Sequence, residues 1–272
     1  MINGFASTDA PHVSLPAEVV WHIGPIDITN SMMLGIVGYG ILIACLLYAA
    51  RVVATNSRRN RLVQIIIWVY EALYGTVKQI VGDSKQARAL APLPISLFFF
   101  IIIQYWTGIF PFVGPITNDG VPLFRSLAAD LNTTFALAII TMVAAQFYAI
   151  KVHGLSGNAA RYFRNPLKDP AGAFEGILEL IAEFSRLVGL SFRLFGNVFA
   201  GEVLLVMIAF LTQYIAIVAL PPFYIFELFI GSIQAYIFFM LTTVFISLGL
   251  SHRDSNHPTA HSPEPRLTES VT

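Results

Sequence analysis

The sequence predicts an all-α membrane protein with about five membrane-crossing helices, one amphipathic surface helix and a long C-terminal helical hairpin. Of the 272 residues, 56% are hydrophobic and only 12% are charged, and the mean hydropathy is +0.70. Soluble domains are about one-quarter charged, so this chain lacks the charge that a water-facing surface needs. Apolar runs close to the length that crosses ~30 Å of hydrocarbon recur along the chain. The clearest runs are residues 31–53, 93–113, 129–150, 187–212 and 221–250.

Helix-starting residues precede two of these runs. Pro92 and Pro94 stand at the start of the second run, where the fixed φ of proline suits a first helical turn. Asp130, Asn132 and Thr133 offer capping side chains at the start of the third.

Segment 60–82 is apolar but carries one polar stripe. Gln64, Glu71 and Lys78 recur every seven residues, which places them on one face of a helix. We interpret this segment as an amphipathic helix on the membrane surface. The alternative is a spanning helix with Glu71 at its centre.

The basic residues favour the surface helix. With five spans and the N-terminus outside, thirteen basic residues face the inside and Arg125 alone faces the outside, in agreement with the positive-inside rule. A spanning 60–82 would divide one basic segment between the two sides. The inside residues are Arg51, Arg58, Arg59, Arg61, Lys78, Lys85, Arg88, Lys151, Arg161, Arg164, Lys168, Arg253 and Arg266.

Composition also argues against several kinds of site and partner. The formal net charge of zero gives no basic surface for nucleic acid. Cys45 is the single cysteine, so neither a disulfide framework nor a cysteine-based metal site is expected. Residues 1–30 carry no Lys or Arg, hence no signal peptide is evident, and we expect them to form an external segment. The polar tail 251–272 is expected to be disordered, and its irregularly spaced histidines are not read as a metal site.

A stripe of charge marks the start of the hairpin that we expect over residues 171–250. Six polar residues from Glu175 to Asn197 share a sector of roughly 80° on one continuous helix. Glu175 fits a solvated face, whereas Glu179 and Glu183 fit either a solvated face or an ion path. The six are Glu175, Glu179, Glu183, Arg186, Arg193 and Asn197.

Arg193 lies within apolar sequence. A charge at the bilayer centre costs about 3 kcal/mol or more and usually marks an ion pathway or a counter-ion. The alternative is that Arg193 snorkels to the inside surface. Gly189, Gly196 and Ala200 project on the same side, and small residues allow another helix to approach closely. We therefore expect Arg193 to face a partner that touches it.

The last helix supplies polar counterparts for the first. Glu227 and Gln234 are seven residues apart and share a face. One antiparallel register sets Gln234 at the depth of Arg193 and Glu227 at the depth of Glu202, nearer the outside. We expect Glu202 and Glu227 to share a proton, although Glu202 lies nine residues beyond Arg193 and so on the opposite face of an ideal helix.

This arrangement predicts an offset ion path. Protons would enter from outside along the two outer carboxylates and leave to the inside past Asn197, Ser185 and Glu179. The fixed charge of Arg193 between the two routes would prevent ions from running straight through, so that transfer requires a mobile carboxylate on a partner.

These same stretches resemble the subunit a family of rotary F-type ATP synthases. The resemblance covers roughly residues 30–250 and is most specific around Arg193. The matching stretches are Arg193-Leu194-Phe195-Gly196-Asn197, Ala200-Gly201-Glu202, Ile233-Gln234-Ala235-Tyr236-Ile237-Phe238, the segment from Pro94 through Gly108-Ile109-Phe110-Pro111, and Asp130-Leu131-Asn132-Thr133-Thr134.

The resemblance implies a stator subunit in a lipid bilayer, against which a ring of c subunits turns. It further implies peripheral-stalk b subunits and the remaining synthase subunits as partners, two offset half-channels, a bacterial plasma membrane location with a cytoplasmic C-terminus, and no cofactor. Glu202 and Gln234 match family positions of the outer half-channel and of the arginine's neighbour. Glu227 stands where some members have histidine, and Arg186 stands where relatives have a basic residue. Glu179, Ser185 and Asn197 match polar positions of the inner half-channel.

The sequence does not fit two other classes of membrane protein. A secondary transporter would carry inverted repeats or paired broken helices, and the sequence contains no internal repeat. An intramembrane enzyme would need a nucleophile with its base, or a phosphate loop, and neither pattern is present.

Overall fold

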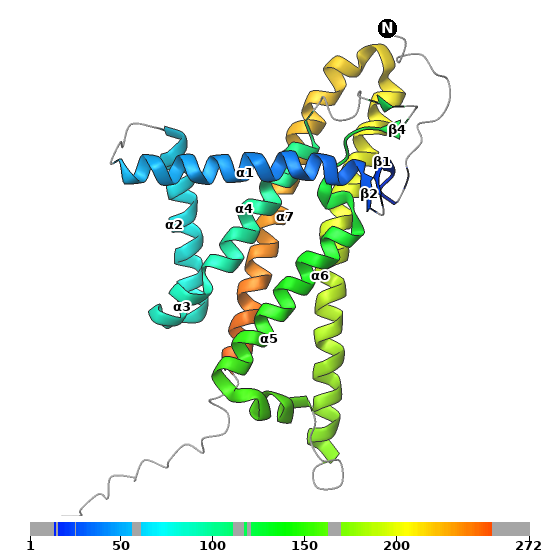
Figure 1. Ribbon diagram of the computed structural model, residues 1–272. Coiled ribbons are helices and arrows are strands. Elements are labelled where there is room, and N and C mark those ends of the chain that lie inside the picture. The colour runs from blue at the N-terminus through cyan, green and yellow to red at the C-terminus, as the bar shows by residue number, and fades with distance from the viewer. Residues whose placement is uncertain are drawn as a thin grey trace, which may run out of the picture.

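The computed structural model describes residues 14, 16–24, 26–55, 61–110, 117–118, 121–162 and 170–251. Figure 1 shows a bundle of long helices in which α1 runs across the others. The tail from residue 252 onward, for which disorder is expected, lies outside the described residues, as do the first thirteen residues.

A small β-hairpin precedes the first helix. Strands β1 (Val19–Ile23) and β2 (Ile26–Thr29) pair antiparallel. Helix α1 (Asn30–Ala54) follows directly, and the Thr29 hydroxyl caps it by accepting a hydrogen bond from the Met32 amide at 3.3 Å. The hairpin was not predicted from the sequence.

Three helices follow in the order α2, α3, α4, over Arg61–Val81, Ser84–Leu90 and Pro92–Gly108. Helix α2 buries Val63, Leu73 and Val77, which lie on one side of it. The prolines at the start of α4 stand where the sequence places them. The helix ends before the predicted limit of 113, because the residue preceding Pro111 is disfavoured in helical conformation.

The described part of the connection from α4 to α5 contains two short strands and one 3-10 turn. Strands β3 (Thr117–Asn118) and β4 (Val121–Pro122) pair, and the 3-10 turn η1 (Leu127–Ala129) follows. Helix α5 (Leu131–Tyr162) begins after Asp130, whose side chain accepts from the Asn132 amide at 3.0 Å. It runs beyond the predicted residue 150, with a break at Gly154, where φ is 76°.

The C-terminal hairpin consists of α6 (Pro170–Thr212) and α7 (Ala216–Ser251), joined by the 3-10 turn η2 (Gln213–Ile215). Figure 1 shows the two helices running antiparallel on either side of that turn. Helix α6 is continuous, so the predicted polar stripe does lie on one helix.

The predicted all-α membrane fold is confirmed. Within the described residues, α1, α5, α6 and α7 are long and apolar enough to cross a membrane, and α3 with α4, bent by 40°, makes a fifth candidate. Helix α2 is not among these candidates, and its position on the membrane surface stays a prediction.

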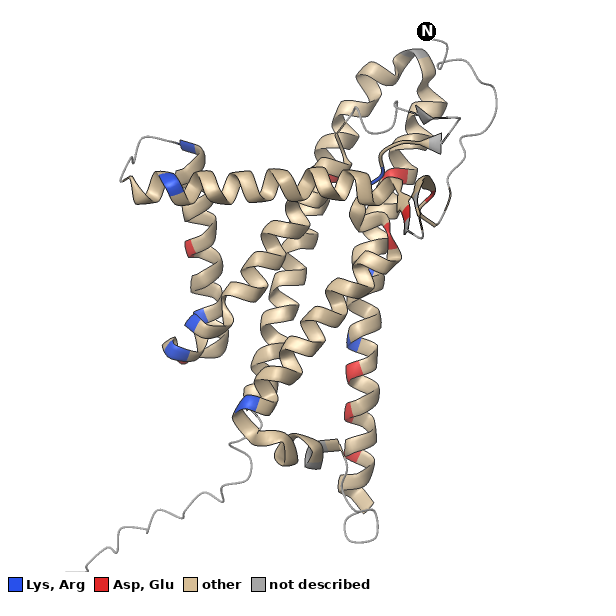
Figure 2. Cartoon of the chain, in the orientation of Figure 1, with Lys and Arg blue, Asp and Glu red and all other residues tan. Residues whose placement is uncertain are grey.

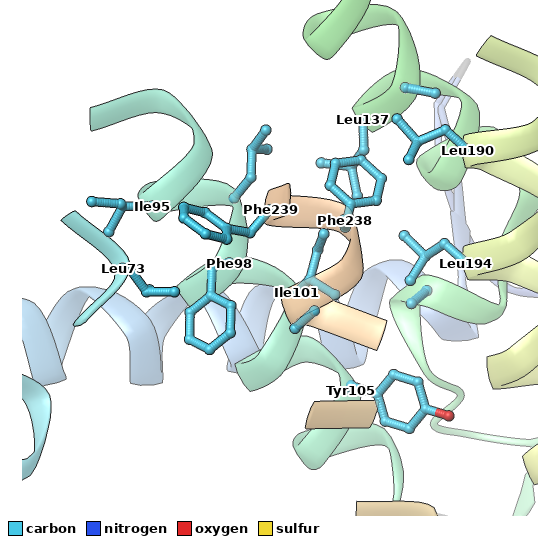
Figure 3. Close-up of a cluster of buried hydrophobic side chains, with 14 of the residues drawn as sticks. Leu73, Ile95, Phe98, Ile101, Tyr105, Leu137, Leu190, Leu194, Phe238 and Phe239 are labelled. Atoms are coloured by element: carbon cyan, nitrogen blue, oxygen red, sulfur yellow. The ribbon is translucent and has the colours of Figure 1, made fainter. Parts of the chain in front are cut away.

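The core lies where α4, α5, α6 and α7 meet. Figure 3 shows its buried side chains, among them Phe98, Ile101, Leu194 and Phe238. Hydroxyl pairs also bridge the helices: Thr134 with Ser191 at 3.1 Å, and Thr141 with Thr242 at 3.4 Å. Interhelical hydrogen bonds of this kind hold membrane helices together where the hydrophobic effect cannot. The core residues labelled in Figure 3 are Leu73, Ile95, Phe98, Ile101, Tyr105, Leu137, Leu190, Leu194, Phe238 and Phe239.

Candidate functional site

Arg193 lies on an exposed face of α6. Gly189, Gly196 and Ala200 are exposed beside it, and a β-carbon added at either glycine would meet no atom within 4 Å. Among the described residues, Arg193 makes no ion pair. Figure 2 shows that the charges of α6 gather along its N-terminal half. The small residues predicted to surround the arginine thus form a smooth, open surface.

Gln234 of α7 pairs with Asn197 rather than with Arg193. The Asn197 side-chain amide donates to the Gln234 Oε1 atom at 2.6 Å. Gln234 is only 1% exposed, and its Nε2 atom has no hydrogen-bond partner among the described residues. The predicted register therefore brings Gln234 to the right part of α6, but one turn further along the helix than Arg193.

Glu227 is buried between three helices. It is 3% exposed, and its Oε1 atom accepts a hydrogen bond from the Tyr105 hydroxyl of α4 at 2.5 Å. Its carboxyl group lies against the bare backbone of Gly201 on α6, where a β-carbon would overlap it. The ring of Tyr105 packs in the same way against Gly231, one turn along α7 from Glu227. Two glycines thus make room for the carboxyl group and its hydrogen-bond donor.

Glu202 has different partners. Its Oε2 atom accepts from Arg125 Nε at 3.2 Å, and its Oε1 atom accepts from the Ser126 amide at 3.1 Å. Glu202 thus has hydrogen-bond donors of its own, and the sharing of a proton between Glu202 and Glu227 stays a prediction. The two carboxylates do lie at similar depth, since Gly201, the neighbour of Glu202, touches Glu227. Gly201 faces Glu227 while Glu202 faces Arg125 and Ser126, because consecutive helical residues are rotated by about 100° about the helix axis.

Arg125 is held on several sides. Its Nη1 atom donates to the Pro16 carbonyl at 2.9 Å, and its guanidinium lies 5.7 Å from the centre of the Phe199 ring. The side chain is 10% exposed. The segment that precedes the β-hairpin is thereby attached, through Arg125, to Glu202 in the C-terminal half of α6.

The N-terminal part of the stripe contains an ion pair. Arg186 Nη2 lies 3.1 Å from Glu179 Oε1, and the Arg186 guanidinium lies 5.6 Å from the centre of the Phe245 ring on α7. Ser185 is exposed. Of the residues predicted for the inner path, Ser185 and Glu179 thus lie on the same helix as Arg193, about two and about four turns before it.

Glu183 faces α5 instead. Its Oε1 atom accepts from Gln146 Nε2 at 2.6 Å and from the Tyr162 hydroxyl. Gln146 Oε1 accepts in turn from Asn158 Nδ2 at 2.9 Å. Of the two readings that the sequence left open for Glu183, a solvated face does not fit, because this network ties it to the neighbouring helix.

Sequence reasoning missed Tyr105, Arg125 and Ser126. Arg125 offered one indication, since it is the single basic residue predicted to face outside. An isolated cation on the side where two carboxylates are expected would favour an ion pair with one of them. Tyr105 offered none, because a tyrosine in an apolar run usually belongs to the core.

Comparison with known proteins agrees with this architecture. The family model described as ATP synthase A chain matches residues 32–247. The chain is 32% identical to ATP synthase subunit a of Desulforamulus reducens over 197 residues, 71% of this chain and 68% of that relative. It is 30% identical to the same subunit of Psychromonas ingrahamii over 242 residues, 86% of each chain. For Aliivibrio fischeri the identity is 35% over 62% of this chain and 64% of the relative. Since the family model covers most of the chain, this multi-pass membrane protein belongs to the ATP synthase subunit a family and serves proton transport in the membrane sector of the F-type enzyme.

Proposed function

We propose that this chain is the stator that passes protons to and from the carboxylates of a rotating c-ring through two offset half-channels. Ion flow through it drives ring rotation and so ATP synthesis elsewhere in the complex, while the chain itself catalyses no covalent reaction. Peripheral-stalk b subunits hold it in place. It lies in the bacterial plasma membrane with its N-terminus outside and its C-terminus in the cytoplasm.

One observation carries this proposal: Arg193 is exposed on a face of small residues. Such a cation cannot remain against lipid without a cost of about 3 kcal/mol or more. A partner bearing a carboxylate would remove that cost, and the open space at Gly189 and Gly196 allows its helix to come close. These features match a ring that presents one carboxylate after another to Arg193.

The polar groups on either side of Arg193 support two separate routes. Glu202 and Glu227 lie toward the turn between α6 and α7, whereas Glu179 and Ser185 lie toward the start of α6. Asn197 and Gln234 form a hydrogen-bonded pair close to the arginine. A proton arriving by one route would pass Arg193 only on a ring carboxylate, because the fixed positive charge opposes free transfer.

The proposal is tested with Arg193→Lys. Arginine keeps its charge when desolvated, whereas lysine readily loses a proton in a low-dielectric site. We expect the variant to insert and assemble but to lose ATP synthesis and ATP-driven acidification of inverted vesicles. Arg51→Lys, on exposed α1, is the matched control and should leave both activities intact. Near-normal coupling in Arg193→Lys at matched subunit levels would refute the proposal.

A further inference from the structure

We infer that the two outer carboxylates have different roles: Glu227 binds and releases the translocated proton, while Glu202 is a fixed anion that Arg125 holds in place. This inference rests on the proposed function and assigns the outer route to particular groups.

Each carboxylate oxygen of Glu202 accepts a hydrogen bond that stabilises the charged form. One oxygen accepts from the Arg125 guanidinium and the other from the Ser126 backbone amide. A proton on Glu202 would have to displace one of these bonds, and it would leave a buried guanidinium without its counter-ion. Removing one member of a buried ion pair is strongly destabilising, because the other charge stays buried without compensation. The Arg125 and Ser126 donors therefore oppose proton binding at Glu202.

Arg125 cannot easily move away to free this site. The Pro16 carbonyl and the Phe199 ring hold two further sides of its guanidinium. A relay group must exchange partners in every cycle, whereas the Arg125 guanidinium contacts Glu202, the Pro16 carbonyl and the Phe199 ring at once. Only its Nη2 atom has no hydrogen-bond partner among the described residues. The pair has the character of a fixed electrostatic element.

Glu227 has the opposite surroundings. Among the described residues no basic side chain forms an ion pair with it. The Glu227 carboxyl group accepts its hydrogen bond from the neutral hydroxyl of Tyr105. A carboxyl group buried without a cation is less costly when it carries a proton, whereas the Tyr105 bond stabilises the charged form. Both forms are thus accessible, as a relay requires.

The step itself is a simple proton exchange. A hydronium ion from the outer side gives a proton to the Glu227 carboxylate, which forms an O–H bond and leaves a water molecule. This O–H bond breaks when the proton passes to a ring carboxylate. Gln234 lies two helical turns along α7 on the same face, beside Asn197 and Arg193. Tyr105 and Arg125 act as positioning residues, the first for Glu227 and the second for Glu202.

The experiment compares single and double variants in the assembled synthase in membrane vesicles. Glu227→Gln should slow ATP-driven proton pumping about 10²-fold or more, the range for losing a proton-transfer group. Glu202→Gln should also pump poorly, because it leaves Arg125 as an unpaired cation near the route. Adding Arg125→Gln should restore pumping to Glu202→Gln, since the charge pair is then removed as a whole. Adding the same change to Glu227→Gln should restore nothing, and this double variant is the matched control.

A second readout is the infrared carbonyl band of a protonated carboxylic acid in the purified complex. Because protonated ring carboxylates also absorb there, the readout is the part of the band that a substitution removes. Glu227→Gln should remove a component that disappears on raising the pH in the unsubstituted protein, and Glu202→Gln should keep this component. Loss of the component in Glu202→Gln alone would overturn the inference.

The pumping results distinguish the roles assigned to Glu202 and Glu227 from the half-channel proposal itself. If Glu202→Gln with Arg125→Gln stays as inactive as Glu202→Gln while Glu227→Gln pumps, the roles are reversed and the half-channel proposal stands. If no variant alters pumping at normal subunit levels, the outer route fails as a whole. If Glu202→Gln fails to assemble on its own, the double variant Glu202→Gln with Arg125→Gln is measured instead. Proton pumping by this variant supports the inference, and its failure to pump contradicts it.

Discussion

Gly201 of α6 supports the carboxyl group of Glu227 on α7, so closely that a β-carbon at position 201 would overlap it. The same carboxyl group holds the Tyr105 hydroxyl at 2.5 Å. The position of Glu227 therefore depends on a missing side chain on the neighbouring helix. This contact also sets the register of the hairpin.

The first prediction follows from this contact. Gly201→Ala should push the Glu227 carboxyl group away from Tyr105 and reduce proton pumping, with a packing cost of about 1–3 kcal/mol. Gly40→Ala on α1 is the control, since a β-carbon there meets no atom within 4 Å. Pumping rates and subunit levels are measured together in vesicles. Equal pumping in the two variants would show that the contact does not matter.

The second prediction concerns the face around Arg193. Gly196→Leu meets open space in this chain, so the subunit should insert and fold. If a ring helix approaches this face, the leucine should keep it away and reduce coupled ATP synthesis about 10²-fold, the cost of an error of about 1 Å in transfer geometry. Gly40→Leu, equally open, should have no such effect. Normal ATP synthesis in Gly196→Leu would exclude close contact here.

The third prediction tests the pair of Asn197 and Gln234. Alanine at both positions should cost less than the two single losses combined, because either change alone breaks the same hydrogen bond. The coupling energy from a double-mutant cycle of pumping rates should be about 0.5–3 kcal/mol. Asn158 pairs with Gln146 instead, so Asn158→Ala combined with Gln234→Ala should be additive. An additive result for Asn197 and Gln234 would contradict the contact.

The fourth prediction concerns Glu183, which joins α6 to α5 through Gln146 and Tyr162. Glu183→Ala should destabilise the solubilised complex by about 1–3 kcal/mol, since it leaves partly buried donors unpaired. Glu183→Gln keeps an acceptor oxygen and should lose less. Glu71→Ala on the exposed face of α2 is the control. Thermal unfolding of the complex measures all three, and no difference between the Glu183→Ala and control variants would contradict the role of the network.

Much of the fold follows from local pattern. The apolar runs predict five helices that the structure contains, and Pro92 and Asp130 stand at the start of two of them. The break at Gly154 and the early end of α4 were not predicted. Both depend on single backbone positions, which average hydrophobicity does not report.

The N-terminal hairpin shows a different limit. Residues 19–29 form paired strands whose adjoining segment bonds to Arg125 through Pro16. The two strands do carry a strand signal, since both are rich in β-branched residues and Ile26 and Ile28 alternate with Asp27 and Thr29. The contact between Pro16 and Arg125 joins segments that are far apart in the sequence. Sequence patterns of one element do not contain that information.

The sequence by itself determined which residues share a helical face and the approximate depth of each polar group, because helical periodicity and an antiparallel turn constrain both. Only the tertiary structure decided which partner each carboxylate meets. Glu227 bonds to Tyr105, 122 residues away, and Glu202 bonds to Arg125, 77 residues away. The physical reason is that the rotation of each helix about its axis is set by side-chain packing against its neighbours. A rotation of about 100° separates one residue from the next, and this directs Glu202 to Arg125 while Gly201 faces Glu227.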